Sequence, residues 1–331
     1  MTVSDASVAA AGCDAADDDR ILPFQVDALD VRGRVVRLGP TVDAILRRHA
    51  YPGAVSRLLG EAVALTVLIG TSLKFDGQLQ LQTRSDGPVD MLVVDFSAPA
   101  SVRAYARFNA ERLAQHPLAS PAELLGRGHL AFTIDQGPHM QRYQGLVPLE
   151  GQGLEEAAHQ YFLRSEQIPT RVRLAVAEEH TPDGRRWRAG GLMVQFLPGS
   201  TERQRQAEFD PGDAPAGSSQ PAFVEDDAWV EARSLVETVT DLELVDSCLS
   251  SESLLYRLFH ERGVRVFAAS SLVERCRCSS ERILEMLRRF TVEDRQAMIG
   301  EDGTIGVTCE FCSVHYSFRP GELDYTSGTD N

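Results

Sequence analysis

Four of the six cysteines in this 331-residue chain lie in two close pairs near its C-terminus. Cys276 and Cys278 form a Cys-x-Cys pair, and Cys309 and Cys312 form a Cys-x-x-Cys pair. In an extended segment the first two sulfurs point to the same side, and a turn brings the second two together. Two such pairs supply the four sulfur ligands of a structural zinc site. The surrounding fifty or so residues have few large apolar side chains, so a metal or a disulfide would have to stabilise them.

The cysteine pattern leaves more than one function open. A permanent zinc ribbon is the simplest interpretation, but Cys-x-Cys is less usual in ribbons. Each pair could also close its own short, strained disulfide, which is reducible and suited to a reversible switch. A thioredoxin-like oxidoreductase would place its Cys-x-x-Cys at a helix N-terminus beside a βαβ unit, and the sequence predicts neither context here.

Composition narrows the class of protein. A hydrophobic fraction of 43% can form a sizeable core, and the length predicts roughly two domains of ~150 residues. The net charge of -15 and the pI near 5.0 argue against nucleic-acid binding. Residues 1–20 lack the basic and apolar regions of a secretory signal. The longest apolar run, residues 62–73, is shorter than the ~20 residues of a membrane span. We expect a cytoplasmic protein without a nucleic-acid or membrane partner.

Residues 21–198 alternate between apolar and polar positions in several short stretches. Turn signals at Asp86-Gly87 and at residues 181–184 predict two hairpins. Thr41 is predicted to cap a short helix, and a long apolar helix should begin near Pro52. Strands grouped with few helices between them predict an α+β core domain on mostly antiparallel sheet around a long buried helix.

The rest of the chain divides by composition. Residues 199–227 are rich in Pro, Gly, Ser and charge, which predicts disorder. Residues 228–263 predict amphipathic helices, with an apolar stripe at Leu254, Leu255, Leu258 and Phe259. The predicted organisation is a disordered acidic tail at 1–20, a core domain at 21–198, a linker at 199–268, a small zinc-binding domain at 269–319 and a tail at 320–331.

Other candidate residues are interpreted structurally. Cys248 is predicted to be a small buried hydrophobe, and Cys13 falls in the N-terminal tail, where no partner is proposed. His315 is interpreted as a surface or packing histidine and not as a ligand. Arg57 and Glu61 are interpreted as an i,i+4 ion pair in preference to a functional pair. No catalytic set and no phosphate-binding loop is found in the sequence, so we expect a protein that is not an enzyme.

The sequence resembles the heat shock protein 33 family of redox-regulated 33 kDa chaperonins, from about Ile21 to Phe318. The resemblance is carried by LLGEAVALTVLIGTSLKFDGQLQLQTRSDGPV, SEQIPTRVRLAV, GGLMVQFLPG, LLYRLFHERGVRVF, CRCSSER and GTIGVTCEFCSVHYSF. The cysteine spacing is its most specific element. The acidic tail, the 199–227 insertion, Cys13 and Cys248 depart from the family pattern.

The resemblance implies a function and a site. It implies that Cys276, Cys278, Cys309 and Cys312 bind one Zn²⁺ when reduced and form Cys276–Cys278 and Cys309–Cys312 disulfides when oxidised. It also implies an ATP-independent holdase for unfolding client proteins under oxidative stress, which is inactive when reduced and dimerises on activation. The alternatives remain a constitutive zinc-ribbon interaction protein and, third, a thiol-disulfide oxidoreductase.

Overall fold

The computed structural model describes residues 18–73, 77–115, 117, 119–137, 140–182, 184–198 and 226–323. One six-stranded sheet, here sheet A, has the order β10-β1-β2-β9-β8, with β11 also paired to β1. All its pairs are antiparallel. Its strands are β1 (Arg20–Val26), β2 (Val31–Leu38), β8 (Thr170–Thr181), β9 (Gly184–Phe196), β10 (Arg265–Val266) and β11 (Ser270–Ser271). The predicted hairpin at 181–184 joins β8 to β9.

A second six-stranded sheet, sheet B, has the order β12-β5-β4-β3-β6-β7. It is antiparallel except for the short β12–β5 pair. Its strands are β3 (Gln78–Ser85), β4 (Met91–Ser97), β5 (Ser101–Arg107), β6 (Arg127–Asp135), β7 (Tyr143–Glu150) and β12 (Val273–Glu274). The predicted hairpin at Asp86-Gly87 joins β3 to β4. The expected α+β class is therefore confirmed.

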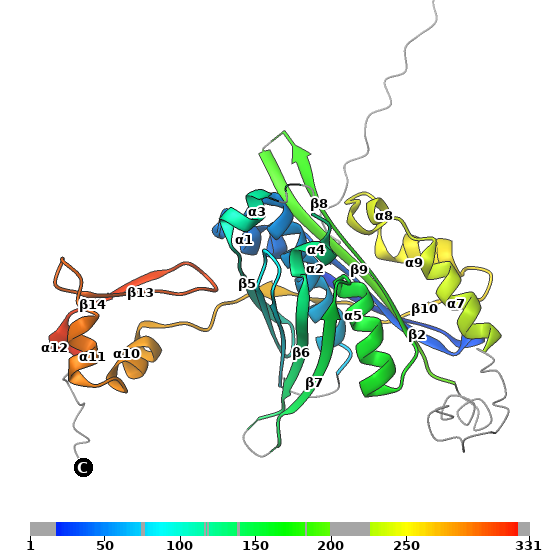
Figure 1. The fold of residues 1–331 in the computed structure, drawn as a ribbon. Helices are drawn as coiled ribbons and strands as arrows, with labels where there is room; N and C mark the ends of the chain where they lie inside the picture. The colour runs from blue at the N-terminus through cyan, green and yellow to red at the C-terminus, as the bar shows by residue number, and fades with distance from the viewer. Residues whose placement is uncertain are drawn as a thin grey trace, which may run out of the picture.

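The long helix α2 (Gly53–Gly70) packs against both sheets (Figure 1). Within the described part of the chain it is the one helix long and apolar enough to cross a membrane, but 78% of that stretch is buried in the fold. The preceding helix α1 (Pro40–Arg48) is not capped by Thr41. The Asp19 carboxylate instead accepts from the backbone N–H groups of Gly39 (3.1 Å) and Thr41 (2.9 Å). The core is completed by η2 (Asp27–Leu29), α3 (Ala110–Gln115), α4 (Pro121–Leu125), α5 (Leu154–Tyr161) and η3 (Phe162–Glu166).

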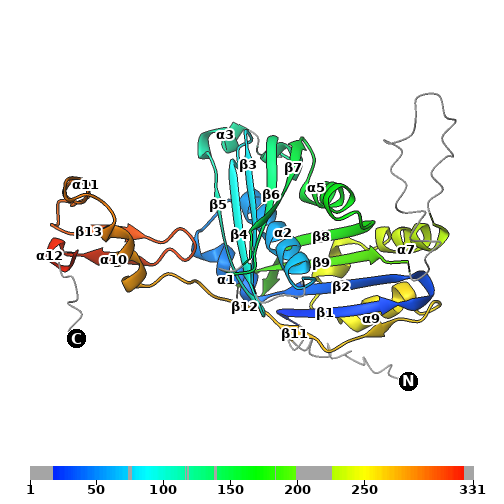
Figure 2. The same cartoon turned by 90° about the horizontal axis from the view of Figure 1, so that it is seen from below.

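Three helices of the predicted linker cover the face of sheet A opposite α2 (Figure 2). They are α7 (Asp227–Glu237), α8 (Asp241–Val245) and α9 (Ser251–Phe259). In the predicted apolar stripe, Leu254, Leu255 and Phe259 are buried, and the Phe259 ring lies 5.8 Å from that of Phe24 on β1. The linker thus shares one hydrophobic cluster with sheet A. Most of the disorder predicted for 199–227 concerns residues outside the described ones, but the prediction is wrong at its end, where Asp226 caps α7 and Asp227 begins it. The tail predicted at 1–20 also ends too late, because Arg20 belongs to β1.

After α9 the chain runs along both sheets as β10, β11 and β12, a segment here called the tether (residues 264–275). It leads to a small C-terminal module at one end of the molecule (Figure 1). The module contains α10 (Ser280–Arg288), α11 (Val292–Ala297), the hairpin β13 (Ile305–Thr308) and β14 (His315–Phe318), and α12 (Pro320–Leu323).

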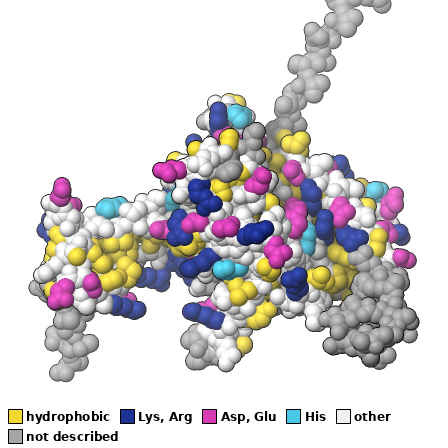
Figure 3. Space-filling view, in the orientation of Figure 1, with side chains coloured by type: hydrophobic (Ala, Val, Ile, Leu, Met, Phe, Trp, Pro, Cys, Tyr) yellow, Lys and Arg dark blue, Asp and Glu magenta, His cyan; other side chains and the backbone are white. Residues whose placement is uncertain are grey.

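The C-terminal module has a very small hydrophobic core. Its buried members are Ile283, Leu287, Ile305, Phe318 and Leu323. Hydrophobic side chains also gather on its surface (Figure 3), where Met286, Phe290, Val292 and Met298 are exposed. A core of this size is too small to stabilise a module of this length without a further cross-link.

Candidate metal centre

The four predicted cysteines lie together where the tether enters the C-terminal module. All four sulfurs lie within 4.8 Å of one another. The Cys276 sulfur is 3.4 Å from that of Cys278 and 3.7 Å from that of Cys309, and Cys278 is 3.2 Å from Cys312. A disulfide is about 2.05 Å long, and these cysteines are free thiols.

The cluster has the size that a tetrahedral metal needs. Four sulfurs about 2.3 Å from a zinc ion would form a tetrahedron with edges of about 3.8 Å. Three of the six sulfur–sulfur separations, 3.2 to 3.7 Å, approach that edge, and all six are within 4.8 Å. The four cysteines could therefore hold a metal ion, and their soft sulfur donors suit zinc.

Local backbone structure brings each pair to the cluster. Cys276 and Cys278 follow β12 in an extended segment, and the Ser279 hydroxyl then caps α10. Cys309 and Cys312 lie in the turn of the β13–β14 hairpin, which is closed by the Cys309 N–H donating to the Val314 carbonyl (3.0 Å). Both pairs are therefore fixed by the local conformations that their spacings predicted.

One neighbour of the cluster was not predicted. The Tyr316 hydroxyl lies 3.2 Å from the Cys278 sulfur. Tyr316 is four positions beyond Cys312 on β14, and nothing in the sequence alone distinguishes it from an ordinary strand tyrosine.

The thiols differ in acidity. Burial raises the pKa of Cys276, but hydrogen bonds from the Cys278 backbone N–H and from neighbouring thiols outweigh this and lower the pKa to about 7. Burial raises the pKa of Cys309 and of Cys312 above the usual thiol range. Without a cation the cluster therefore resists full ionisation, because four thiolates at this spacing would repel one another.

The turn that carries Cys309 and Cys312 docks on the core domain. The Arg103 guanidinium carbon lies over the Phe311 ring, 3.8 Å from the ring centroid. The Phe311 and Tyr105 rings meet edge-on, with their centroids 4.8 Å apart. His49 contacts the Phe311 carbonyl through Nε2 (3.2 Å) and the Ser313 hydroxyl through Nδ1 (3.1 Å). The tip of the module is thus held by aromatic, cation–π and hydrogen-bond contacts.

A buried carboxylate lies behind this contact. Asp95 on β4 is 5% exposed and accepts from Gln80 (2.8 Å), Arg103 (2.6 Å) and Arg277 (3.1 Å). Arg277 lies between Cys276 and Cys278, so the core carboxylate holds the segment that carries the first cysteine pair. Asp95, Arg103, Phe311 and His49 are called the docking surface below.

Two other interpretations from the sequence are wrong. Cys248 is exposed in the turn between α8 and α9 and is disulfide-bonded, so it is not a buried hydrophobe; Cys13 lies outside the described residues.

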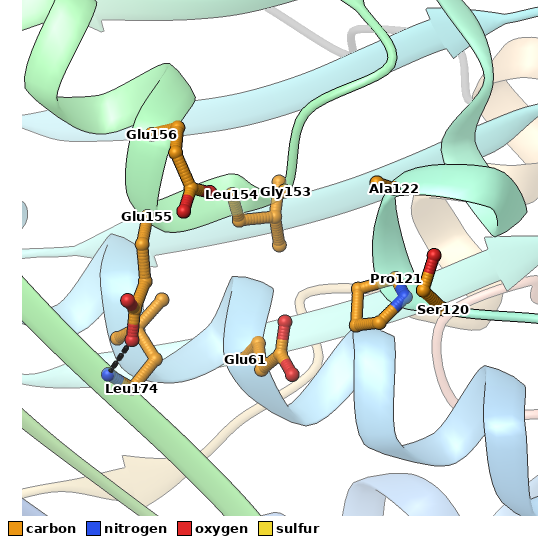
Figure 4. A pocket seen from close by; sticks show the side chains of 9 residues that line it. All are labelled: Glu61, Ser120, Pro121, Ala122, Gly153, Leu154, Glu155, Glu156 and Leu174. Carbon is orange, nitrogen blue, oxygen red and sulfur yellow. Dashed lines mark hydrogen bonds between the residues drawn. The ribbon is translucent and has the colours of Figure 1, made fainter.

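Among the described ion pairs none joins Arg57 to Glu61. Glu61 instead faces a pocket with Glu155 and Glu156 (Figure 4), where burial and the neighbouring Glu155 carboxylate raise its pKa to about 8. His315 is exposed and bonds Thr308, as a surface histidine would.

The sequence profile described as "Hsp33 protein" matches residues 19–319. The chain belongs to the Hsp33 family. The 33 kDa chaperonin of Caulobacter vibrioides is 44% identical over 307 residues, which cover 92% of this chain and 95% of that protein. The 33 kDa chaperonin of Pseudomonas fluorescens is 37% identical over 311 residues, 94% of each chain.

The fold of this Hsp33 chain also matches a solved structure. The crystal structure of the 33 kDa chaperonin of Thermotoga maritima superimposes with a TM-score of 0.72 at 21% identity, covering 92% of this chain and 97% of that one. The family and its named relatives make the protein a chaperone, and a chaperone binds client proteins.

Proposed function

We propose that this Hsp33 chain is a cytoplasmic, redox-regulated, ATP-independent holdase that binds unfolding proteins under oxidative stress. The observation that supports this best is the cluster of four free sulfurs within 4.8 Å, in a module with a very small core of its own. The module continues directly into the tether and the linker helices that cover sheet A. In this proposal residues 21–198 are the chaperone core, 199–268 the linker and 269–319 the switch.

In the reduced state Cys276, Cys278, Cys309 and Cys312 hold one zinc ion. Zinc bound there would keep all four sulfurs as thiolates, the form that reacts with peroxide. In each pair two thiolates would give two electrons to one peroxide molecule. With two protons from solvent the peroxide leaves as water, and the sulfurs join.

The disulfide pairing in this proposal is Cys276–Cys278 and Cys309–Cys312, and it rests on the family resemblance. Distance alone does not select it, because the Cys278 sulfur is 3.2 Å from Cys312 and 3.4 Å from Cys276. Peptide mapping of the oxidised protein by mass spectrometry distinguishes the two pairings.

Oxidation would remove the ligands on which the module depends. Metal binding in small thiolate sites is worth about 10 to 16 kcal/mol, and this is folding free energy. Two disulfides that close very short loops constrain the unfolded chain little, so they would not replace it. The module would unfold, the tether would detach and the linker helices would loosen from sheet A.

Client binding would use the surface that the linker covers. Phe24, Leu192 and Phe196 of sheet A are buried in the hydrophobic cluster that they share with the linker helices on this face. Exposed together, such side chains form an apolar patch that binds unfolded chains or a second copy of the protein. We therefore also propose a homodimer on activation.

The test is light scattering of an aggregating client with the protein reduced and oxidised, beside a metal assay. A holdase of this kind suppresses aggregation only after oxidation and loses its zinc at the same time. A static zinc-ribbon protein would be indifferent to oxidant, and an oxidoreductase would turn over disulfide substrates. Equal suppression in the reduced and oxidised states would refute the proposed switch.

A further inference from the structure

The end of linker helix α8 is bound by two arginines of sheet A. Arg37 on β2 donates to the carbonyls of Glu243 (2.9 Å), Leu244 (3.3 Å) and Asp246 (2.8 Å). Arg188 on β9 donates through Nε to the Val245 carbonyl (2.9 Å). The last four carbonyls of a helix have no partner within the helix. Here the carbonyls of the last three helical residues and of the C-cap residue Asp246 accept from two core guanidinium groups, while the Leu242 carbonyl accepts from the Asp246 N–H.

Sheet A is shaped for this contact. Arg37 and Gly190 are direct partners across the β2–β9 ladder, and Arg188 lies two residues from Gly190 on the same face of β9. A Cβ atom on Gly190 would lie 2.1 Å from the Leu244 carbonyl oxygen. Only a residue without a side chain therefore lets the end of α8 reach the floor between the two arginines.

The two guanidinium groups are buried, and their chemistry selects this ligand. Arg37 is 2% exposed and Arg188 is 6% exposed. The Asp18 carboxylate balances the charge of Arg188, while Arg37 donates to three main-chain carbonyls. A buried guanidinium that lost these acceptors would be left incompletely solvated. The ligand that suits two buried guanidinium groups is the C-terminal end of a helix, because its last carbonyls have no partner within the helix and carry partial negative charge.

We propose that Arg37, Arg188 and Gly190 form a binding site for the C-terminal end of a helix, and that α8 fills this site to hold the linker on the core. The site contains none of the four clustered cysteines, so it would set how readily the linker opens without supplying a metal ligand. The disulfide-bonded Cys248 lies two residues beyond Asp246, and its backbone N–H donates to the Asp246 carboxylate. The inference deepens the proposed function, because it names the residues that position the linker.

The experiment uses the full chain, reduced and zinc-loaded. Arg37→Met removes three of the four hydrogen bonds but keeps an apolar stem, and Gly190→Ala blocks the approach of Leu244. Arg32→Met is the matched control, because Arg32 lies on the same strand and bonds Gln195 on the other face of the sheet. Amide hydrogen exchange is measured over 227–259 and over α2, with metal content beside it.

We expect Arg37→Met and Gly190→Ala to raise exchange in α7, α8 and α9 by about tenfold or more. Exchange in α2 and the metal content should stay as in wild type, and Arg32→Met should change nothing in the linker. Unchanged linker exchange in both variants, with α2 still protected, would overturn the proposal. If Gly190→Ala raised exchange in α2, the substitution would have destabilised the core. Linker exchange in Arg37→Met would then decide the question by the same two outcomes.

A second assay measures how well the reduced variants suppress the aggregation of a client protein, and it separates this inference from the proposed function. Faster linker exchange together with client holding in the reduced state supports both. Faster linker exchange without client holding supports the helix-binding site and contradicts the proposal that the linker covers the client surface.

Discussion

Phe311→Ala tests whether docking of the C-terminal module helps to keep the linker closed. Phe311 is not a candidate ligand, but its ring joins the cysteine turn to Arg103 and Tyr105 of the core. We expect the variant to undock the module while it keeps its metal. The tether should then open more often, because its short strands β11 and β12 pair with the core by only two residues each.

The magnitude follows from the contacts that the ring makes. A guanidinium 3.8 Å from the ring centroid in a partly buried site contributes about 1 kcal/mol. The edge-on pair with Tyr105 at 4.8 Å contributes about another 1 kcal/mol. A loss of about 2 kcal/mol shifts the docking equilibrium roughly 30-fold.

The assay is hydrogen exchange of the reduced, metal-loaded protein, resolved at residues 264–275 and in α2. Exchange of the tether should rise by up to the same roughly 30-fold, with α2 unchanged. Phe290→Ala is the matched control, since Phe290 is a phenylalanine of the same module and is exposed. Small-angle scattering reports separately whether the module has left the core.

An undocked module by scattering, together with wild-type exchange in the tether, would contradict this prediction. Docking would then contribute nothing to closure. A wild-type scattering profile for Phe311→Ala would instead show that the ring contacts are worth less than the two magnitudes suggest.

Three further predictions concern the metal, the docking surface and the core. Cys309→Ser should bind less than one zinc per chain and lower the melting temperature of the module; stoichiometric zinc with unchanged melting would contradict the ligand set. Asp95→Asn leaves Arg103 and Arg277 without their shared charge partner, which costs about 3 to 5 kcal/mol in a buried pair, and urea unfolding measures it. Glu61 has a folded pKa of about 8, above that of the unfolded chain, so the contribution of Glu61 to stability falls as pH rises from about 4.5 to 8. Glu61→Gln should remove this fall, and equal pH dependence in the two proteins would show that Glu61 is ionised in the fold.

Features encoded by neighbouring residues could be predicted from the sequence. The Asp86-Gly87 turn defines its hairpin locally, and the stripe at Leu254, Leu255 and Phe259 shows which face of α9 is buried. The four cysteines were predicted to come together because each pair is fixed by its own short segment. In each case the determining residues lie within one element or one turn.

Contacts between distant segments could not be predicted in this way. Asp19 accepts from the first N–H groups of α1 although it lies before β1, 22 positions ahead of Thr41. No local pattern marks Asp19 as the cap, so Thr41 was the candidate that the sequence offered. Asp95 meets Arg277 across most of the chain, and no periodicity marks either residue as a partner. Glu61 looked paired with Arg57 because the i,i+4 spacing allows it, but the pocket formed with α5 decides the environment of Glu61. Tertiary packing determines all of these.

The linker is held on sheet A at two separate places, and this separation matters for a switch. One end of the linker continues into the tether and the module, which depend on the four cysteines. At the other, Arg37 and Arg188 hold the carbonyl end of α8 together with the apolar cluster under α7 and α9. Oxidation of the four clustered cysteines would act on the first place, so the second, which lies beside the disulfide-bonded Cys248, sets the free energy that remains to be overcome. A linker held too firmly there would stay closed after the metal is lost, and one held too weakly would open in the reduced state. The second place has four hydrogen bonds from buried guanidinium groups. Each contributes only a small net free energy, because opening the linker would exchange it for hydrogen bonds to water. Together they hold the linker with intermediate strength.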